Sequence, residues 1–198
     1  LAEVGGVLIA GNQLDTSTLT EEDFNDLKSR WRKYLVGDET LDFSNKYIRE
    51  LVDKIDKQAQ VSWKLINREA DAQVLFGEKL VVVTADMNKQ YGRLHDMAMG
   101  WGTYGTSVYQ NTKLKNDILY GLRWLNEHYY GEAEIEKRGW ASLTSPNWHD
   151  WMIVTPRWLT EILIVMQPEM EQKDIDKYLA IYNYIPNVIK YGPSRSVS

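Results

Sequence analysis

The stretch SPNWHDWMIVTPRWLTEILIVM, residues 145–166, decides the fold because it joins an aromatic and polar cluster to an apolar helix. Pro156 suits the first position of that helix, where no backbone N–H is needed, and Thr155 is predicted to cap it with its hydroxyl. The run from Pro156 to Met166 is apolar on nearly every side, which indicates a helix at the centre of the protein. The cluster is therefore expected to lie in a loop that leads into a buried helix.

The cluster contains three of the chain's eight tryptophans and three short polar residues: Trp148, Trp151, Trp158, Asn147, His149 and Asp150. Pyranose rings stack their C–H faces on flat aromatic rings, and their hydroxyl groups bond to short polar side chains. This composition is typical of a sugar-binding wall. The alternative is that the tryptophans pack in the core between helices, since indole rings are on average well buried.

The overall composition narrows the classes of function. At 198 residues the chain has the usual size of one compact domain. Its net charge of −5 argues against a nucleic-acid partner, which would need a basic stripe for the phosphates. The absence of cysteine excludes disulfides, thiolate metal sites and a cysteine nucleophile. No apolar run reaches the ~18 residues of a membrane span, so no membrane span is predicted.

Apolar residues recur every three to four positions in six segments, and this periodicity predicts helices. No convincing strand pattern is present, so we expect an all-α fold of antiparallel helical hairpins. Such hairpins can build a bundle, a solenoid or a closed toroid. The helices are expected at about residues 20–36, 45–72, 84–101, 111–130, 156–166 and 171–184.

Three further segments lack helical periodicity. Residues 1–19 are predicted to be an extended leader, and residues 74–83 a buried connector. Residues 131–154 form the longest such stretch, and loops of more than ~12 residues in a compact domain are usually functional or disordered. The tryptophans in this stretch favour a functional loop. In the first helix, the predicted buried face consists of Phe24, Leu27, Trp31 and Leu35.

Common catalytic motifs are missing from the sequence. It contains no HExxH, no GxSxG and no Gly-rich phosphate loop, which excludes zincins, α/β-hydrolases and P-loop enzymes. His95 and His128 are explained by structural roles within helices, whereas His149 lies in the Trp-rich loop and is a candidate for function. Asp150 is the one carboxylate in a tight apolar loop, so paired carboxylates for glycoside hydrolysis stay an alternative. No metal site and no cofactor is predicted.

Four blocks, in order along the chain, carry the motifs of one enzyme family. NWHDWMIVTPRWL at 147–159 is similar to the signature NWWxxEIGxPxxL. LKSRWRKYLVG at 27–37 is similar to the family's first helix, and KLINREADA at 64–72 to the region that leads into its toroid. YGRLHDMAMGWGTYGTSVYQN at 91–111, followed by LKNDILYGLRWLNEHYY at 114–130, is similar to the stretch RL…MA…YQN…GL.WL. Together these blocks resemble polysaccharide lyase family 8, the hyaluronate, chondroitin AC and xanthan lyases.

The resemblance implies an incomplete (α/α) toroid with a long cleft for an acidic polysaccharide. In the family, the tryptophans of NWW form an aromatic patch that guides the polymer into position. Trp148 matches that motif directly, whereas His149 replaces the second tryptophan and is a candidate to offer a hydrogen bond or a positive charge to a uronate. Trp151 is a candidate to restore an aromatic face nearby. The predicted substrate-binding residues are Asn147, Trp148, His149 and Trp151, and Met152 and Val154 are further departures from the signature.

The family's chemistry is β-elimination, carried out by an Asn, a His and a Tyr that follow the NWW segment by many residues. No residue of this chain matches them, so the catalytic residues are expected beyond Ser198. The resemblance thus implies that residues 20–198 are the N-terminal part of a toroid catalytic domain, truncated before its catalytic segment. The partner would be the C-terminal remainder of the same enzyme. Such a fragment is expected to be inactive alone and to come from a secreted or periplasmic enzyme.

Three other classes of function stay open at this point. A non-catalytic carbohydrate-binding helical module would use the same aromatic loop without a downstream catalytic segment. An (α/α) toroid glycoside hydrolase would need two carboxylates that face each other across the cleft. A helical interaction scaffold would bury the tryptophans in its core, and replacing Trp148 by alanine would then cost ~3–5 kcal/mol of stability.

Overall fold

The computed structural model describes residues 20–69, 71–77, 83–138 and 148–184. This part of the chain is built from helices, with one isolated antiparallel bridge between Ile66 and Phe76, which confirms the predicted all-α fold. None of these helices is long and apolar enough to cross a membrane. The elements are α1 (Glu21–Val36), α2 (Lys46–Lys64), α3 (Val83–Gly102), α4 (Thr112–His128), α5 (Glu132–Arg138), the π-turn η2 (Asp150–Val154), α7 (Thr155–Met166), the 3-10 turn η3 (Gln167–Glu169), α8 (Gln172–Leu179) and the 3-10 turn η4 (Ala180–Asn183).

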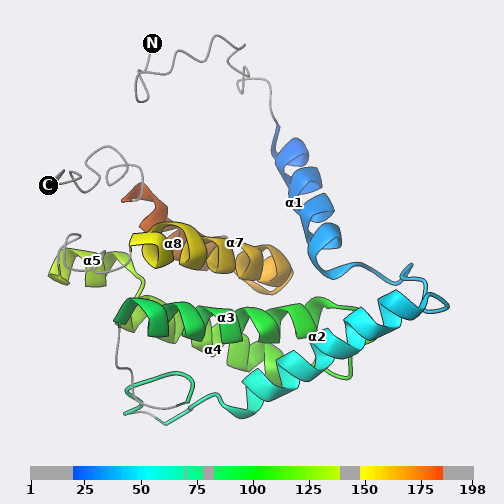
Figure 1. Ribbon diagram of the computed structural model, residues 1–198. Helices are drawn as coiled ribbons and strands as arrows, with labels where there is room; N and C mark the ends of the chain where they lie inside the picture. The colour runs from blue at the N-terminus through cyan, green and yellow to red at the C-terminus, as the bar shows by residue number, and fades with distance from the viewer. Residues whose placement is uncertain (1–19, 70, 78–82, 139–147, 185–198) are drawn as a thin grey trace, which may run out of the picture.

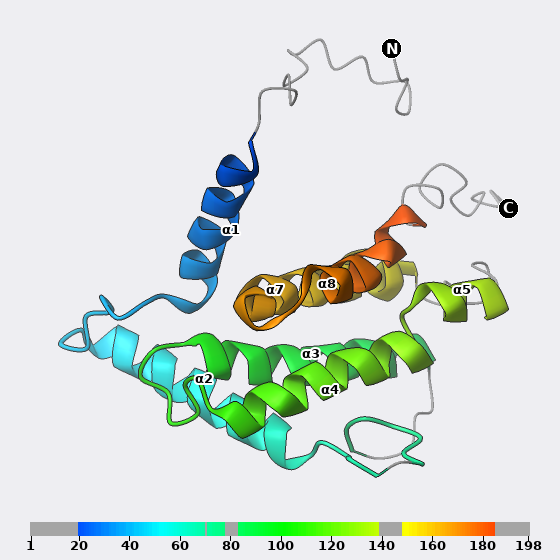
Figure 2. The same cartoon turned by 180° about the vertical axis from the view of Figure 1, so that it is seen from behind.

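The helices are arranged around α3, which packs against α2, α4 and α7. Successive helices α2, α3 and α4 run in alternating directions, and α7 and α8 form a second antiparallel pair on top of them (Figures 1 and 2). α1 stands at an angle to this body and contacts it through α7 and α3 (Figure 1). The predicted antiparallel hairpins are therefore present, with α3 at their centre.

The core forms along the predicted apolar faces of the helices. On α3, the side chains of Met87, Tyr91, Leu94, Ala98 and Trp101 are all at most 3% exposed. The predicted inward faces of α4 and α7 meet this face of α3 and are buried as well. On these two helices the buried residues include Leu114, Ile118, Leu122, Leu125, Leu159, Ile162, Leu163 and Met166.

The second helix is shorter than predicted. α2 begins after its N-cap Asn45, as expected, but ends at Lys64 instead of near residue 72. Beyond that end, the backbone N–H of Asn67 donates to the carbonyl oxygen of Leu75 at 2.7 Å. This hydrogen bond turns the chain back on itself next to the isolated bridge, so backbone groups that would continue the helix bond elsewhere.

The predictions for the three segments without helical periodicity fared differently. Val74, Leu75 and Phe76 are buried, which confirms the predicted connector over its described part. Within the stretch predicted to be one long loop, α5 forms at Glu132–Arg138, so that prediction was wrong for its first part. The leader at residues 1–19 lies outside the described residues.

α1 forms where predicted but exposes most of its apolar face. Its first turn has a capping box, in which the backbone N–H of Asp23 donates to the Thr20 hydroxyl and the Thr20 N–H donates to the Asp23 carboxylate. The predicted burial was wrong for Phe24, Leu27 and Trp31, which are 48%, 58% and 48% exposed. The reason is that α1 stands off the body of the molecule, so its apolar stripe has no helix packed along its length within the described chain.

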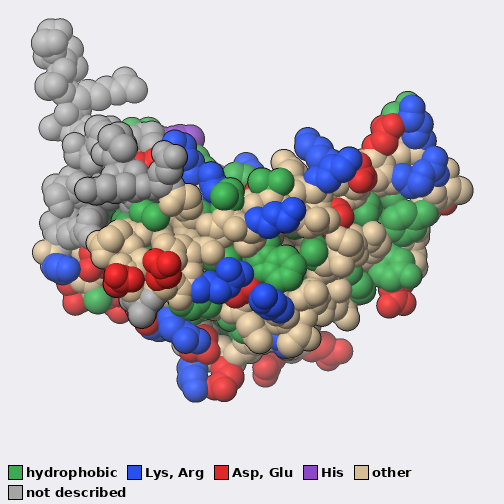
Figure 3. Space-filling view, turned by 90° about the horizontal axis from the view of Figure 1, so that it is seen from below, with side chains coloured by type: hydrophobic (Ala, Val, Ile, Leu, Met, Phe, Trp, Pro, Cys, Tyr) green, Lys and Arg blue, Asp and Glu red, His purple; other side chains and the backbone are tan. Residues whose placement is uncertain are grey.

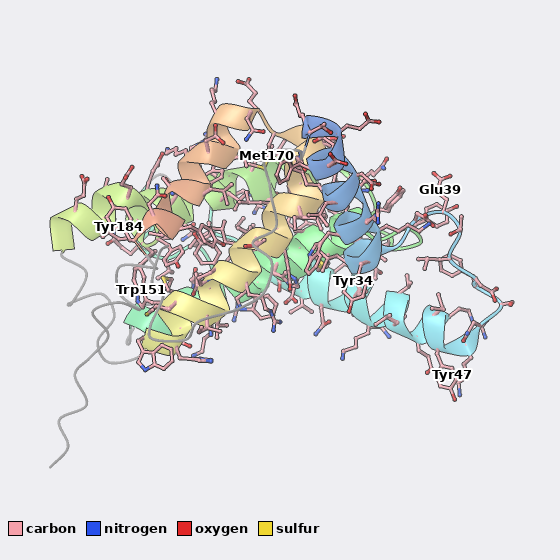
Figure 4. All side chains as sticks on the ribbon, turned by 90° about the horizontal axis from the view of Figure 1, so that it is seen from above. Tyr34, Glu39, Tyr47, Trp151, Met170 and Tyr184 are labelled. Atoms are coloured by element: carbon pink, nitrogen blue, oxygen red, sulfur yellow. The ribbon has the colours of Figure 1, made fainter. Side chains whose placement is uncertain are left out.

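Exposed aromatic side chains continue onto α2. Tyr34 and Tyr47 are 83% and 77% exposed, and Figure 4 shows Tyr47 pointing away from the helices. On the face seen from below, apolar patches alternate with charged side chains (Figure 3). The periodicity of α1 and α2 therefore identifies amphipathic helices correctly, although part of each apolar face meets solvent.

Two hydrogen-bonded side chains tie the end of α2 and the following segment to α4 through Asp117. The guanidinium of Arg68 donates to both carboxylate oxygens of Asp117, at 2.8 and 2.6 Å, and Trp63 Nε1 donates at 2.6 Å. Burial alone would raise the pKa of Asp117, but these hydrogen bonds and the positive charge of Arg68 outweigh it and lower the pKa below its usual value. The ionised carboxylate therefore stabilises the fold.

We predict that Asp117→Asn lowers the free energy of unfolding at pH 7 by ~1.5–3 kcal/mol, the range for hydrogen bonds to charged groups. A carboxylate with a lowered folded pKa contributes stability above its unfolded pKa of ~3.9 and loses it as pH falls through the folded pKa. The gap between the parent and the variant should thus shrink below about pH 4. Urea unfolding at several pH values measures this difference in the free energy of unfolding. Asp53→Asn, in the exposed Asp53–Lys57 pair, is the control and should change the free energy of unfolding very little. A gap that is constant or widens toward low pH would contradict this role.

α2 and α3 approach each other closely at Gly100. A Cβ atom at this position would overlap with Cβ of Ala59, which is fully buried on α2. At Gly92, in the same helix, a Cβ atom would meet nothing within 4 Å. Only the smallest side chain therefore fits at Gly100, whereas Gly92 has room.

We predict opposite effects of the same substitution at these two glycines. Gly100→Ala should lower the free energy of unfolding by ~1–3 kcal/mol, because α2 must move away from α3. Gly92→Ala should raise it by up to ~1 kcal/mol, because alanine is the better helix former. Urea unfolding followed by circular dichroism measures both variants. Equal effects at the two positions would show that the helices do not touch as described.

Candidate functional site: the aromatic turn before α7

A helical turn at residues 148–154 carries four residues of the predicted cluster, Trp148, His149, Asp150 and Trp151. The chain is helical from Trp148, becomes the π-turn η2 at Asp150 and continues directly into α7. Trp148 is 48% exposed, and His149 is exposed as well. Their rings meet edge to face, with centroids 6.0 Å apart and planes at 80°. An indole and an imidazole are thus presented together at the surface, while Asn147 lies outside the described residues.

The turn is continuous with α7, which corrects the predicted cap at Thr155. Thr155 has helical backbone angles, φ −63° and ψ −45°, and its N–H donates to the carbonyl oxygen of Asp150. Its side chain is buried and caps nothing. Pro156 follows, and a proline inside a helix lacks an N–H and crowds the carbonyl four residues earlier. A π-turn adds one residue at this point, which accommodates the proline without ending the helix.

Trp151 is buried, contrary to the prediction that it offers an aromatic face. Its exposed fraction is 0%, and its ring centroid lies 4.9 Å from that of Tyr130. The Tyr130 hydroxyl donates to the carbonyl oxygen of Trp151 at 2.6 Å. Figure 4 shows Trp151 among the helices at the end of the molecule that also carries Tyr184. Core packing, the alternative considered for the tryptophans, therefore applies to Trp151 but not to Trp148.

Asp150 is held from α3 by Asn88. Asp150 is 7% exposed, and its Oδ1 accepts a hydrogen bond from Asn88 Nδ2 at 3.3 Å. The Oδ1 of the same Asn88 accepts a hydrogen bond from Trp158 Nε1 on α7 at 3.0 Å. The side-chain amide of Asn88 on α3 is thus bonded both to Asp150 in the turn and to Trp158 on α7. Asp150 is placed inside the fold beneath the exposed pair.

A layer of charged and aromatic groups surrounds Trp158. The guanidinium carbon of Arg157 lies 4.5 Å from the indole centroid, and the ring of His95 lies 4.4 Å from it. Glu161 contacts both, with Oε2 at 2.7 Å from His95 Nε2 and Oε1 at 3.5 Å from Arg157 Nε. Burial, together with the charge of Arg157, lowers the pKa of His95 to about 4, and burial raises the pKa of Glu161. Both shifts disfavour charge in this layer, and His95 has the structural contacts predicted for it.

His128 also has a structural place, as predicted. It lies in the last turn of α4, where its Nδ1 is 2.8 Å from the carbonyl oxygen of Trp124. Its ring stacks on that of Trp124, with centroids 4.3 Å apart. Among the residues with described positions, no three His, Cys, Asp or Glu side chains converge in a way that could hold a metal ion.

Sequence reasoning missed two members of the site. Glu161 follows Arg157 by four positions on one helix, and this spacing is a readable signal for a side-chain contact. Asn88 carries no such signal, because it precedes Asp150 by 62 positions. The contact between Asn88 and the turn depends on the packing of α3 against α7, which periodicity does not specify.

Comparison with known proteins places this fold in a family. The family model described as "Polysaccharide lyase family 8, N terminal alpha-helical domain" matches residues 31–193. A xanthan lyase of Bacillus sp. (strain GL1) is 27% identical over 203 residues, covering 98% of this chain and 21% of that protein. Hyaluronate lyase HylB of Enterococcus faecalis is 27% identical over 171 residues, covering 85% of this chain and 16% of that protein.

Solved structures show the same helical arrangement. A Paenibacillus xanthan lyase matches with a TM-score of 0.74 and 27% identity, covering 83% of this chain and 15% of that chain. A Streptomyces coelicolor A3 chondroitin AC lyase, solved with chondroitin sulphate, matches in fold with a TM-score of 0.72 and 20% identity. The match covers 87% of this chain and 22% of that chain. The chain spans between 15% and 22% of the length of these four relatives. From the family match over most of its length and the shared helical fold, the chain belongs to polysaccharide lyase family 8.

Proposed function

We propose that this chain is the N-terminal helical part of a lyase that cleaves a uronic-acid-containing polysaccharide by β-elimination, and that it supplies aromatic surface to the substrate cleft. The single observation that carries the cleft role is the half-exposed side chain of Trp148 on a turn in which Asp150 and Trp151 are buried. Family membership supports the reaction class, since the relatives are named as hyaluronate, xanthan and chondroitin AC lyases. We infer no preference among these three polysaccharides.

The exposed pair, Trp148 and His149, can contact both the apolar ring face and the polar groups of a sugar acid. The open face of Trp148 can stack on the C–H face of a pyranose ring, an apolar contact that does not depend on charge. The neighbouring imidazole of His149 can donate a hydrogen bond to a carboxylate or hydroxyl at the edge of the same ring. Because Asp150 and Trp151 are buried directly behind them, the two ligand-facing groups are held on a supported backbone. Pre-organised groups lose less entropy on binding.

The proposed reaction needs groups that we place beyond Ser198. In β-elimination a base removes the C5 proton of the uronate, the C4–O bond breaks, a C4–C5 double bond forms, and an acid protonates the leaving oxygen. The uronate carboxylate must be neutralised so that the C5 proton becomes acidic enough. The greater length of the relatives supports a C-terminal remainder that carries these groups. A secreted or periplasmic location belongs to the same proposal.

Glycoside hydrolysis is less well supported. Asp150, the carboxylate singled out for that chemistry, is buried and bonded to Asn88 instead of facing an open surface. A hydrolase needs two carboxylates on either side of the scissile bond. The geometry of Asp150 suits a structural role, and a lyase remains the function favoured by the family.

The ultraviolet absorbance of unsaturated uronate products tests the reaction class. We expect the polypeptide that includes the C-terminal remainder to generate this absorbance from hyaluronan, chondroitin or xanthan. The 198 residues alone should bind an oligosaccharide of the same substrate without turnover, and Trp148→Ala should weaken that binding by about tenfold, or ~1.4 kcal/mol. Turnover by the 198 residues would refute the placement of the chemistry. Saturated products from the longer polypeptide would favour a hydrolase.

Stability measurements separate the two tryptophans of the turn. Trp151→Ala should lower the free energy of unfolding by ~3–5 kcal/mol, because it leaves a cavity beside Tyr130. Trp148→Ala should change it by less than ~1 kcal/mol, because this residue is already half exposed. Urea unfolding of both variants gives the comparison. A large loss for Trp148→Ala would support a helical scaffold with tryptophans in its core.

A further inference from the structure

The two hydrogen bonds of Asn88 require a donor and an acceptor on one short side chain. The Oδ1 of Asp150 accepts a hydrogen bond from Asn88, and the indole N–H of Trp158 donates one to Asn88. An amide satisfies both partners at once. A carboxylate at position 88 would set like charges against each other, and an aliphatic side chain would remove the acceptor from the indole N–H.

The bond from Asn88 ends next to the exposed pair. Asp150 directly follows His149 and lies two positions after Trp148. The turn has a second fixed point one residue later, where the Tyr130 hydroxyl donates to the carbonyl oxygen of Trp151. Of these two fixed points, the one at Asp150 lies nearer in sequence to the ligand-facing side chains.

We propose that Asn88 is a positioning residue for Trp148 and His149. By holding Asp150 against α3 and accepting the Trp158 N–H on α7, it sets the direction in which the turn presents the indole face. Asn88 acts through the turn without touching the ligand. The inference rests on the proposed function for its ligand, a uronic-acid-containing polysaccharide, while its effect on the turn can be measured without any ligand.

Hydrogen–deuterium exchange over residues 148–154 tests the effect on the turn. Asn88→Asp keeps the shape of the side chain but cannot donate to Asp150, and Asn88→Ala removes both bonds at a half-buried position. Asn25→Asp makes the same chemical change on the exposed surface of α1 and is the matched control. Both Asn88 variants should speed exchange of the turn about fivefold, the equivalent of one hydrogen bond, with α4 and the control unchanged. Unchanged exchange over the turn in both variants would overturn the proposal.

Calorimetric titration with oligosaccharides of hyaluronan, chondroitin and xanthan tests the link to the ligand. For whichever of these the unaltered chain binds, Asn88→Asp should weaken binding about fivefold. When Trp148 is already replaced by alanine, Asn88→Asp should weaken binding by a clearly smaller factor, because Asn88 acts on the ligand through the Trp148 ring. Losses that add in full would reduce Asn88 to a general structural role and overturn the proposal. If the unaltered chain binds none of the three, the cleft role fails, and the exchange result alone decides the role of Asn88.

Discussion

The burial of Trp151 is the constraint on which the site depends. Its ring is sealed against Tyr130 and its carbonyl oxygen is bonded by the Tyr130 hydroxyl, so the backbone at this point cannot move without opening the core. Residues three apart on an α-helix share a face, which would bury or expose Trp148 and Trp151 together. The π-turn that begins at Asp150 changes that geometry, and the two rings are 48% and 0% exposed. One indole anchors the turn and the other is left open.

The same turn explains how a proline and an aromatic surface fit at the start of a central helix. The extra residue of the π-turn accommodates Pro156, so α7 continues inward without a break and without a cap from Thr155. On the inner side, Asn88 joins Asp150 to Trp158. Burial lowers the pKa of His95 and raises the pKa of Glu161, the two ionisable groups that contact each other beside Trp158. In the proposed function, recognition belongs to this chain and the chemistry to the remainder.

Periodicity predicted most of the helices because each has an apolar stripe at helical spacing, and α3 buries the residues that its pattern selects. The pattern does not say what covers a stripe, which is why Trp31 on α1 was expected to be buried and is half exposed. The end of α2 depends on a hydrogen bond between Asn67 and Leu75, and no local signal predicts that contact. In the site, the family motif selected Trp148, whereas Asn88 could not be found because its partners lie on other elements far along the chain.

Of the two indole rings in the turn, we propose that Trp148 is open to a sugar, while Trp151 is sealed in the core. Nuclear magnetic resonance of the ¹⁵N-labelled indole N–H groups, during titration with oligosaccharides of hyaluronan, chondroitin and xanthan, tests it most directly. We expect the indole resonance of Trp148 to shift with at least one of the three and the resonance of Trp151 to stay in place. A shift of Trp151 without one of Trp148, or a Trp148 resonance unmoved by all three sugars, would contradict it.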